Sequence, residues 1–207
     1  MSFQLLLHSP ATLVLLVANI AISILAFGNS RLLDAMLLDV GAIRRRNQHY
    51  RLVTSGFVHG DPGHLFMNML TLFFFGPYLE YRVGTEAFVL VYFLSLLAGS
   101  AWSYMENFRN PNYKALGASG AISGVVIAFA LFEPFAMLFV FFIPAPAIVF
   151  AVLYIVYSAY ASSGRRSDGI GHGAHLGGAL MGLVTVCVFW PEAIRHLWRE
   201  LARLIGV

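Results

Sequence analysis

Charged residues are scarce in this chain. Only 11% of its 207 residues are Asp, Glu, Lys or Arg, whereas 59% are hydrophobic. In an ordinary soluble domain about a quarter of the residues are charged. The composition therefore excludes a soluble globular domain and predicts an integral membrane protein.

Cysteine is nearly absent as well. The single cysteine, Cys187, lies in an apolar run, so the chain can form no intramolecular disulfide. We expect this thiol to be a small core residue. The net charge is +3, but the basic residues are spread over loops and the C-terminal tail. This distribution favours anchoring at the membrane interface over a nucleic-acid partner.

Patterns typical of metal sites and transporters are missing too. His59, His64, His172 and His175 offer imidazoles, but no His-Glu-x-x-His sequence and no cysteine or carboxylate pattern completes a ligand set. The sequence also has no inverted repeat and no chain of ionisable residues within its apolar segments. We therefore expect neither a metal site nor a solute pathway.

Six apolar segments approach or reach the length of about 20 residues that a helix needs to cross a bilayer. They are Ala11 to Phe27, His64 to Leu79, Thr85 to Met105, Gly117 to Phe132, Pro134 to Tyr157 and about Gly171 to Trp190. Asp61 and Pro62 are typical of a helix cap followed by a first-turn proline, which extends the second segment upstream. No basic stretch precedes the first segment, so it is expected to be a retained span.

These segments predict an all-α, polytopic bundle of six transmembrane helices. We expect one membrane domain over residues 1–207, with a six-span core of about 11–190. The longest connection, Gly28 to Gly63, mixes apolar clusters with arginines and is expected to be embedded in the membrane interface. In the tail, residues 191–207, arginines recur every four residues, which predicts an amphipathic surface helix.

Polar side chains inside membrane spans are costly, so they are the first candidates for a functional site. Four stand out: His64 and Asn68 in the second span, Ser119 in the fourth and His175 in the sixth. These three spans run in the same direction. All four residues are therefore expected a few residues below the same membrane face.

Small residues at four-residue spacing let membrane helices approach backbone to backbone. The fourth span carries Gly120 and Gly124, and the sixth carries Ala174, Gly178 and Gly182. If these two seams face each other, the serine of the fourth span and the histidine of the sixth emerge at the same level.

A serine beside a histidine supports acyl transfer, because the imidazole takes the proton of the hydroxyl. We expect Ser119 to be the nucleophile and His175 the base. The Ser119 N–H, the Asn68 amide and His64 are candidates to stabilise the oxyanion. Asp168 precedes His175 by seven residues but is expected in a loop, so the prediction is a dyad.

Structural roles compete with these assignments. Asn68 alone is typical of a hydrogen bond between helices, and His64 of a satisfied polar group at a helix start. His59 and His172 are expected to be structural or interfacial. The segment around Ser119 is, by itself, also typical of tight helix packing.

Five short motifs, taken together, resemble those of the rhomboid intramembrane serine proteases. They are Tyr50-Arg51, the His-x4-His-x3-Asn of His59, His64 and Asn68, the Glu-x-Arg-x-Gly of Glu80, Arg82 and Gly84, the Gly-x-Ser-Gly of Gly117 to Gly120, and the Ala-His-x-x-Gly of Ala174 to Gly178. Each motif alone is weak. Five in order and at the family's spacing make a specific signal, which covers most of the six-span core.

The resemblance implies cleavage of a peptide bond within or beside a transmembrane segment of a single-pass membrane protein, without a cofactor. It implies Ser119 as the nucleophile, His175 as general base and acid, and an oxyanion hole of His64, Asn68 and the Ser119 amide. It further implies a set of supporting residues: Arg51, His59, Glu80, Arg82, Gly117, Gly120, Gly178 and Gly182.

The resemblance also implies a water-filled cavity open to one side and substrate access past the fifth span. Pro144 and Pro146 interrupt that span, which predicts a kinked or locally mobile helix. Ser123 stands where many relatives carry an aromatic residue that stacks on the base histidine. Without an aromatic residue at position 123, the sequence does not predict how His175 is oriented.

Six spans place both termini on one side of the membrane. Nine of the thirteen basic residues fall in connections on the other side, and the positive-inside rule would make that side cytoplasmic. The resemblance instead implies cytoplasmic termini. We prefer the latter because five of the nine lie in the first connection, which is structurally constrained.

The sequence thus predicts a multi-pass serine endopeptidase of the inner or plasma membrane. The alternative is a catalytically inactive rhomboid-like protein that binds or escorts membrane proteins. The presence of both Ser119 and His175 argues against that alternative.

Overall fold

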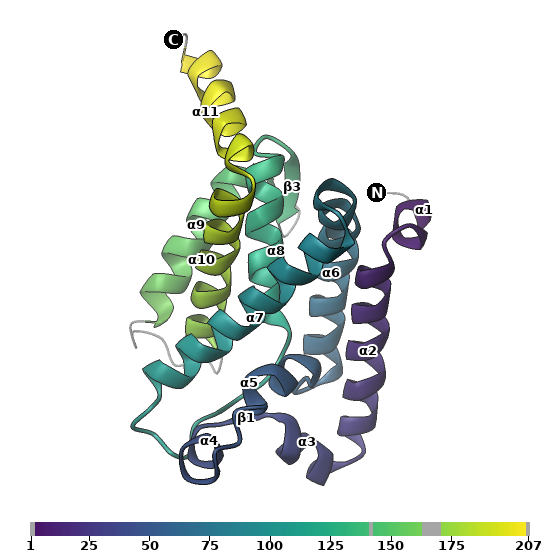
Figure 1. Cartoon of the computed structure of the whole chain (residues 1–207), viewed down its shortest axis with the longest axis vertical. Helices are drawn as coiled ribbons and strands as arrows, with labels where there is room; N and C mark the ends of the chain where they lie inside the picture. The colour runs from purple at the N-terminus through teal and green to yellow at the C-terminus, as the bar shows by residue number, and fades with distance from the viewer. Residues whose placement is uncertain (1–2, 141–142, 163–170, 206–207) are drawn as a thin grey trace.

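Six long helices form the body of the molecule. The computed structural model describes residues 3–140, 143–162 and 171–205. Within them, the long helices of the bundle are α2 (Pro10–Phe27), α6 (Pro62–Val83), α7 (Thr85–Glu106), α8 (Ser119–Phe132), α9 (Ala147–Tyr160) and α10 (His172–Phe189). Figure 1 shows these helices gathered into one bundle, with α2 and α9 at opposite edges. The predicted helical membrane bundle is confirmed.

The lengths of these helices fit a multi-pass membrane protein. By length and composition, α2, α7 and α10 are long and apolar enough to cross a membrane. The helices α8 and α9 are apolar but shorter, at 14 residues each. In α6, which has 22 residues, Pro77 lies inside the helix. In α10, Cys187 is exposed, so the expectation that its thiol lies in the core is wrong.

The central helix is α8, which is buried on every side. All its residues from Gly120 to Phe132 are buried, because α6, α7 and α10 surround it. A Cβ added to Gly178 would lie 1.9 Å from the Gly120 carbonyl oxygen, and one added to Gly182 would lie 2.4 Å from that of Gly124. The two glycine seams therefore face each other, as the sequence predicts.

The prediction for the fifth span is wrong over its first half. Residues that were expected to be helical from Pro134 form an antiparallel hairpin of β3 (Met137–Val140) and β4 (Ile143–Pro146), and α9 begins only at Ala147. Proline has no N–H to donate and its ring clashes inside a helix. Pro144 and Pro146 are therefore in an extended strand before α9, and they do not kink a helix.

The connection between α2 and α6 has a small core of its own. It contains α3 (Ser30–Met36), β1 (Leu38–Asp39), α4 (Val40–Arg46), α5 (Arg51–Thr54) and η1 (Ser55–Phe57). β1 pairs with β2 (Lys114–Ala115) of the third connection. Leu38, Val40 and Ile43 are buried in a cluster against Tyr104 and Tyr113. Some of the apolar side chains that were expected to face lipid thus pack within the protein.

Arg51 holds this connection in place from inside. Its guanidinium is buried and donates to the carbonyl oxygens of Asp34 and Leu37 at 2.7 Å each, and to the Gln48 side chain at 2.8 Å. A buried cation with three acceptors is stabilising only while all of them stay in place. These contacts join the Arg51 side chain to the end of α3 and to the turn before α5.

Glu80 joins the ends of three helices. Its buried carboxylate accepts hydrogen bonds from the Ala11 and Thr12 N–H groups at the start of α2 and from the Thr85 hydroxyl at the start of α7. The first N–H groups of a helix lack partners within it, and an anion suits that end of the helix dipole. Nearby, the exposed Arg82 guanidinium lies over the Phe132 ring at 5.4 Å.

Two further helices lie near the two ends of the chain, and each contributes one buried side chain to the core, Leu6 and Ala193. α1 (Phe3–Leu7) precedes α2, and α11 (Pro191–Ile205) extends away from the end of α10 (Figure 1). Trp198 of α11 is 73% exposed. The tail is therefore helical, as expected, while its position at the lipid headgroups stays a prediction.

Candidate active site

Ser119 and His175 meet at the starts of two neighbouring helices. Ser119 is the first residue of α8, and His175 lies in the first turn of α10. The Ser119 Oγ and the His175 Nε2 are 2.8 Å apart, and both side chains are half-buried. This distance is a hydrogen bond through which a proton can pass directly.

Close backbone packing brings this pair together. A Cβ added to Gly99 of α7 would lie 2.5 Å from the Ala174 carbonyl oxygen, and one added to Gly120 would lie 3.2 Å from the same atom. The residue before His175 is therefore packed directly against α7 and α8. The glycines set the depth of the histidine relative to the serine.

His64 packs against the turn that precedes the serine. Its backbone N–H is capped by the Asp61 carboxylate at 2.9 Å. Gly117 has a φ of +115°, and an added Cβ would lie 2.7 Å from the His64 ring. Only glycine suits both this backbone conformation and this contact. The structure thus places the His64 ring against Gly117, two residues before Ser119.

His59 contacts the same turn through the Ala118 N–H. Its Nε2 accepts a hydrogen bond of 3.4 Å from the Ala118 N–H, and its Nδ1 lies 2.8 Å from the Ser23 hydroxyl of α2. The Ser23 hydroxyl in turn lies 3.1 Å from the Phe57 carbonyl oxygen, to which it donates. This order leaves the proton on Nδ1 of a neutral ring.

The surroundings of His59 favour that neutral ring. Burial, together with the neighbouring His64, lowers the pKa of His59 to about 4, and Asp61 opposes the shift only in part. The His64 and His59 rings meet edge to face, with centroids 5.0 Å apart. The Nε2 of His59 is therefore free to accept the Ala118 N–H at neutral pH.

Asn68 and Ser119 line the same cavity. It has a volume of about 220 Å³ and lies among α6, α8 and α9. Its lining residues are Met67, Asn68, Thr71, Ser119, Ile122, Ser123, Val126, Phe150 and Tyr154. The Asn68 amide donates one hydrogen to the His64 carbonyl oxygen of its own helix at 2.9 Å. Its nitrogen carries two hydrogens, so a second donor remains for the cavity.

The orientation of the imidazole, which the sequence leaves open, involves Tyr154 of α9. The Tyr154 and His175 rings are stacked, with centroids 6.2 Å apart and planes inclined by 24°. Tyr154 was not among the predicted site residues. Its partners lie 21 and 31 residues away in the chain on other helices, so no short motif could have identified it.

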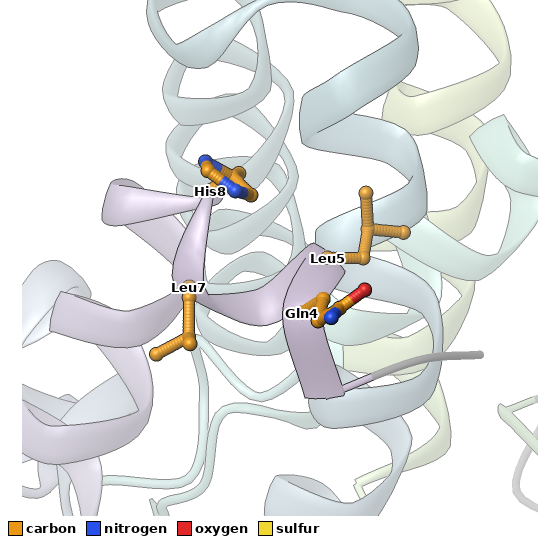
Figure 2. A pocket seen from close by; sticks show the side chains of 4 residues that line it. All are labelled: Gln4, Leu5, Leu7 and His8. Atoms are coloured by element: carbon orange, nitrogen blue, oxygen red, sulfur yellow. The ribbon is translucent and has the colours of Figure 1, made fainter.

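A larger hollow lies at the opposite end of the bundle. It has a volume of about 450 Å³ and is lined by Gln4, Leu5, Leu7 and His8 around α1. Figure 2 shows that these side chains do not converge, since Leu5 and Leu7 point in opposite directions. α1 packs beside the start of α2, whereas the serine lies beside the start of α6. This hollow is not part of the site.

The remaining predicted residues fall into two groups. Gly120, Gly178 and Gly182 are in the seam between α8 and α10, close to the pair. Glu80 and Arg82 lie at the far end of α6 from His64, where the Glu80 carboxylate accepts hydrogen bonds from the starts of α2 and α7. Asp168 is outside the residues that the structure describes.

The arrangement has the parts that acyl transfer needs. A hydroxyl is hydrogen-bonded to an imidazole nitrogen and opens onto a cavity. The Ser119 N–H belongs to the first turn of α8, where N–H groups have no helical acceptor. Such donors at the positive end of a helix dipole suit a developing oxyanion.

Comparison with known proteins identifies the family. The family model described as the rhomboid domain matches residues 46–192, which include Ser119, His175 and all the residues that line the cavity. RHOMBOID-like protein 12, mitochondrial, of Arabidopsis thaliana is 28% identical over 82% of this chain and 55% of its own length. Rhomboid protein 1, mitochondrial, of Saccharomyces cerevisiae is 37% identical over 64% of this chain and 40% of its own length.

A third relative carries a protease name. Rhomboid-like protease 3 of Toxoplasma gondii is 32% identical over 70% of this chain and 53% of its own length. The chain thus spans about half the length of the curated relatives that it matches. The match of the domain over most of the chain is sufficient to assign the family, and the protein belongs to the rhomboid family.

Proposed function

We propose that this protein is an intramembrane serine endopeptidase that cleaves transmembrane segments of single-pass membrane proteins. The observation that carries the proposal is the 2.8 Å contact between the Ser119 Oγ and the His175 Nε2 at the wall of a cavity. Membership of the rhomboid family and the protease name of one relative support it.

In the first half of the reaction, Ser119 is acylated. The Ser119 Oγ bonds to the carbonyl carbon of the substrate while its proton passes to the His175 Nε2, and the carbonyl π electrons move onto oxygen. The carbon–nitrogen bond then breaks, and the imidazolium gives its proton to the leaving amine. An acyl ester on Ser119 and a free amine terminus result.

In the second half, water takes the place of the amine. The water oxygen bonds to the ester carbon while a water proton passes to His175. The bond between that carbon and the Ser119 Oγ then breaks. The serine oxygen regains the proton from the imidazolium. The carboxyl terminus of the other fragment leaves, and the enzyme is restored without a cofactor.

The oxyanion formed in each half needs donors. We assign this role to the Ser119 N–H, the Asn68 amide and the His64 ring. The half-buried Ser119 and the buried Asn68 amide share one cavity, which supports their assignment. The position of His64 against Gly117, beside the serine, supports its own.

Paired variants test the proposal. A reporter with a glycine-containing transmembrane segment is co-expressed with the wild type, Ser119→Ala or His175→Ala, and the cleaved product is measured. We expect product with the wild type and none above background with either variant at equal protein levels. Labelling by a fluorophosphonate should occur in the wild type and disappear in Ser119→Ala. Product that persists in Ser119→Ala would refute the mechanism.

The same experiment distinguishes the enzyme from the alternative, an inactive rhomboid-like protein that binds or escorts membrane proteins. That protein would neither cleave reporters nor react with the fluorophosphonate, and Ser119→Ala would leave its co-purification with membrane partners unchanged. The hydrogen-bonded pair, which binding alone does not need, favours the enzyme.

We place the enzyme in an inner or plasma membrane, with the lipid bilayer and the transmembrane segments of its substrates as partners. Two of the relatives carry mitochondrial names, so the mitochondrial inner membrane is the other location to test. Fractionation with markers of each membrane distinguishes the two.

A further inference from the structure

The imidazole of His175 lies between aromatic rings from two directions. Tyr154 of α9 is stacked on it at 6.2 Å and 24°, and His172 of its own helix meets it edge-on at 6.0 Å and 83°. Offset-stacked and edge-to-face pairs with centroids 4.5–7 Å apart are the favoured arrangements of such rings. The stacked ring restricts rotation of the imidazole about its bond to the Cβ.

The Tyr154 ring is itself held in place. One turn earlier on α9, Phe150 is stacked on it at 5.6 Å and 27°. Its hydroxyl lies 2.6 Å from the Ser123 Oγ of α8. Tyr154 thus contacts two neighbouring helices, with its ring face on α10 and its hydroxyl on α8.

The direction of these hydrogen bonds can be assigned. The Ser123 hydroxyl donates to the Ser119 carbonyl oxygen at 2.7 Å, one helical turn back. A serine hydroxyl has only one hydrogen, so the Tyr154 O–H must be the donor in the other bond. A chain of two hydrogen bonds therefore runs from Tyr154 to the backbone of the residue that carries the nucleophilic oxygen.

We infer that Tyr154 is the positioning residue for His175, with its ring restricting the imidazole and its hydroxyl, through Ser123, tying α9 to the serine. The inference rests on the proposed function, since it assigns to Tyr154 the alignment of the base with Ser119. The residue takes no proton. It acts through the His175 ring and, by way of Ser123, on the backbone of Ser119. Substitution of Tyr154 is therefore expected to lower kcat and to leave KM nearly unchanged, because binding of the substrate does not require an aligned base.

Three substitutions separate the ring from the hydroxyl. Tyr154→Leu removes the ring, Tyr154→Phe keeps the ring without the hydroxyl, and Ser123→Ala removes the acceptor. A misplacement of catalytic groups by about 1 Å can cost about 100-fold in rate. We expect Tyr154→Leu to lower kcat by about tenfold to 100-fold with KM within about twofold. Tyr154→Phe and Ser123→Ala should each retain at least about a third of kcat.

The double variant Tyr154→Phe, Ser123→Ala tests the bond between the two hydroxyls. Both single changes break the same bond, so the double variant should lose no more activity than the more impaired single one. Tyr81→Leu, the same chemical change at a side chain of α6 that is 75% exposed, is the matched control and should leave kcat unchanged.

The labelling rate of Ser119 with a fluorophosphonate provides a readout independent of the substrate. In Tyr154→Leu it should fall in parallel with kcat, while thermal unfolding in detergent stays close to that of the wild type. If Tyr154→Leu does not accumulate, Tyr154→Met provides the same test with a flexible side chain in place of the ring.

The outcomes separate this inference from the proposed function. Wild-type kcat in Tyr154→Leu, or equal losses in Tyr154→Leu and Tyr154→Phe, would overturn the role of the ring while an inactive Ser119→Ala leaves the protease assignment intact. A wild type that neither cleaves nor labels would overturn the protease assignment and, with it, this inference.

Discussion

His59 is a buried residue whose protonation state matters for the fold. Its Nε2 accepts the Ala118 N–H only while the ring is neutral, and its pKa is lowered from 6.5 to about 4. Between these values the unfolded chain binds a proton at this position that the folded chain does not bind. The free energy of unfolding therefore decreases as the pH falls through this range.

We expect His59 to contribute a loss of about 2.5 kcal/mol between pH 7 and pH 4.5, since one pKa unit corresponds to about 1.4 kcal/mol. Unfolding in detergent, titrated with SDS at several pH values, measures this loss. In His59→Gln the pH dependence should flatten, whereas the exposed His49→Gln should keep it. The same slope in His59→Gln and in the wild type would contradict the prediction.

Glu80 offers a second test at a single side chain. Its carboxylate accepts four hydrogen bonds, three of them from the start of α2. In Glu80→Gln one oxygen is replaced by a donor that faces donors, so buried N–H groups lose their acceptor. We expect the free energy of unfolding to fall by about 1–3 kcal/mol.

The control for Glu80 lies six residues further on. Glu86 is exposed in the first turn of α7, and Glu86→Gln should change the free energy of unfolding by less than about 1 kcal/mol. Equal effects of the two substitutions would show that the contacts of Glu80 contribute nothing specific.

Among the elements, the contact between α8 and α10 sets the geometry of the pair. A Cβ at Gly178 would lie 1.9 Å from the Gly120 carbonyl oxygen, so Gly178→Ala must push the two helices apart. We expect the free energy of unfolding to fall by about 1–3 kcal/mol. Cleavage should fall by at least about tenfold, since the distance between the Ser119 and His175 side chains increases.

Gly28 provides the matched control for this substitution. It follows α2 with a φ of −90°, and a Cβ there would meet nothing within 4 Å. Gly28→Ala should change neither unfolding nor cleavage appreciably. Wild-type cleavage by Gly178→Ala would mean that the seam does not determine the position of the histidine.

The bounds of the six long helices show which of them can be predicted from the sequence and which cannot. Hydropathy places five of the six long helices well, because a helix that satisfies all its backbone groups is the favoured way to cross hydrocarbon. The fifth is misplaced because Met137 to Ile143 is as apolar as the helix that follows. Pro144 and Pro146 were the signal for the true start of α9, and the sequence analysis interpreted them as a kink.

At the scale of the whole molecule, the glycine seams and the shared direction of three spans bring Ser119 beside His175. These features could be predicted because they depend on spacing within single helices. The contact of Tyr154 with His175 could not, because it depends on how α9 is rotated against α10. Helix rotation is set by packing among many side chains, which no local pattern encodes.

The orientation of the molecule in the membrane is a testable property of the whole chain. In a Cys187→Ser background, single cysteines at His49 and at Arg199 mark the first connection and the tail. With cytoplasmic termini, a membrane-impermeant maleimide should label intact cells at position 49 and not at position 199. A permeant maleimide should label both. The reverse pattern would follow the positive-inside rule and contradict the orientation that we prefer.

The ring on the imidazole comes from α9, whereas the nucleophile comes from α8. With Tyr154 as the positioning residue, a displacement of α9 that widens the cavity also removes the ring from its place over the histidine. The site would then be inactive while the cavity is open, and active again once α9 has closed around the bound substrate. This coupling would prevent cleavage of membrane proteins that only touch the open cavity without binding in it.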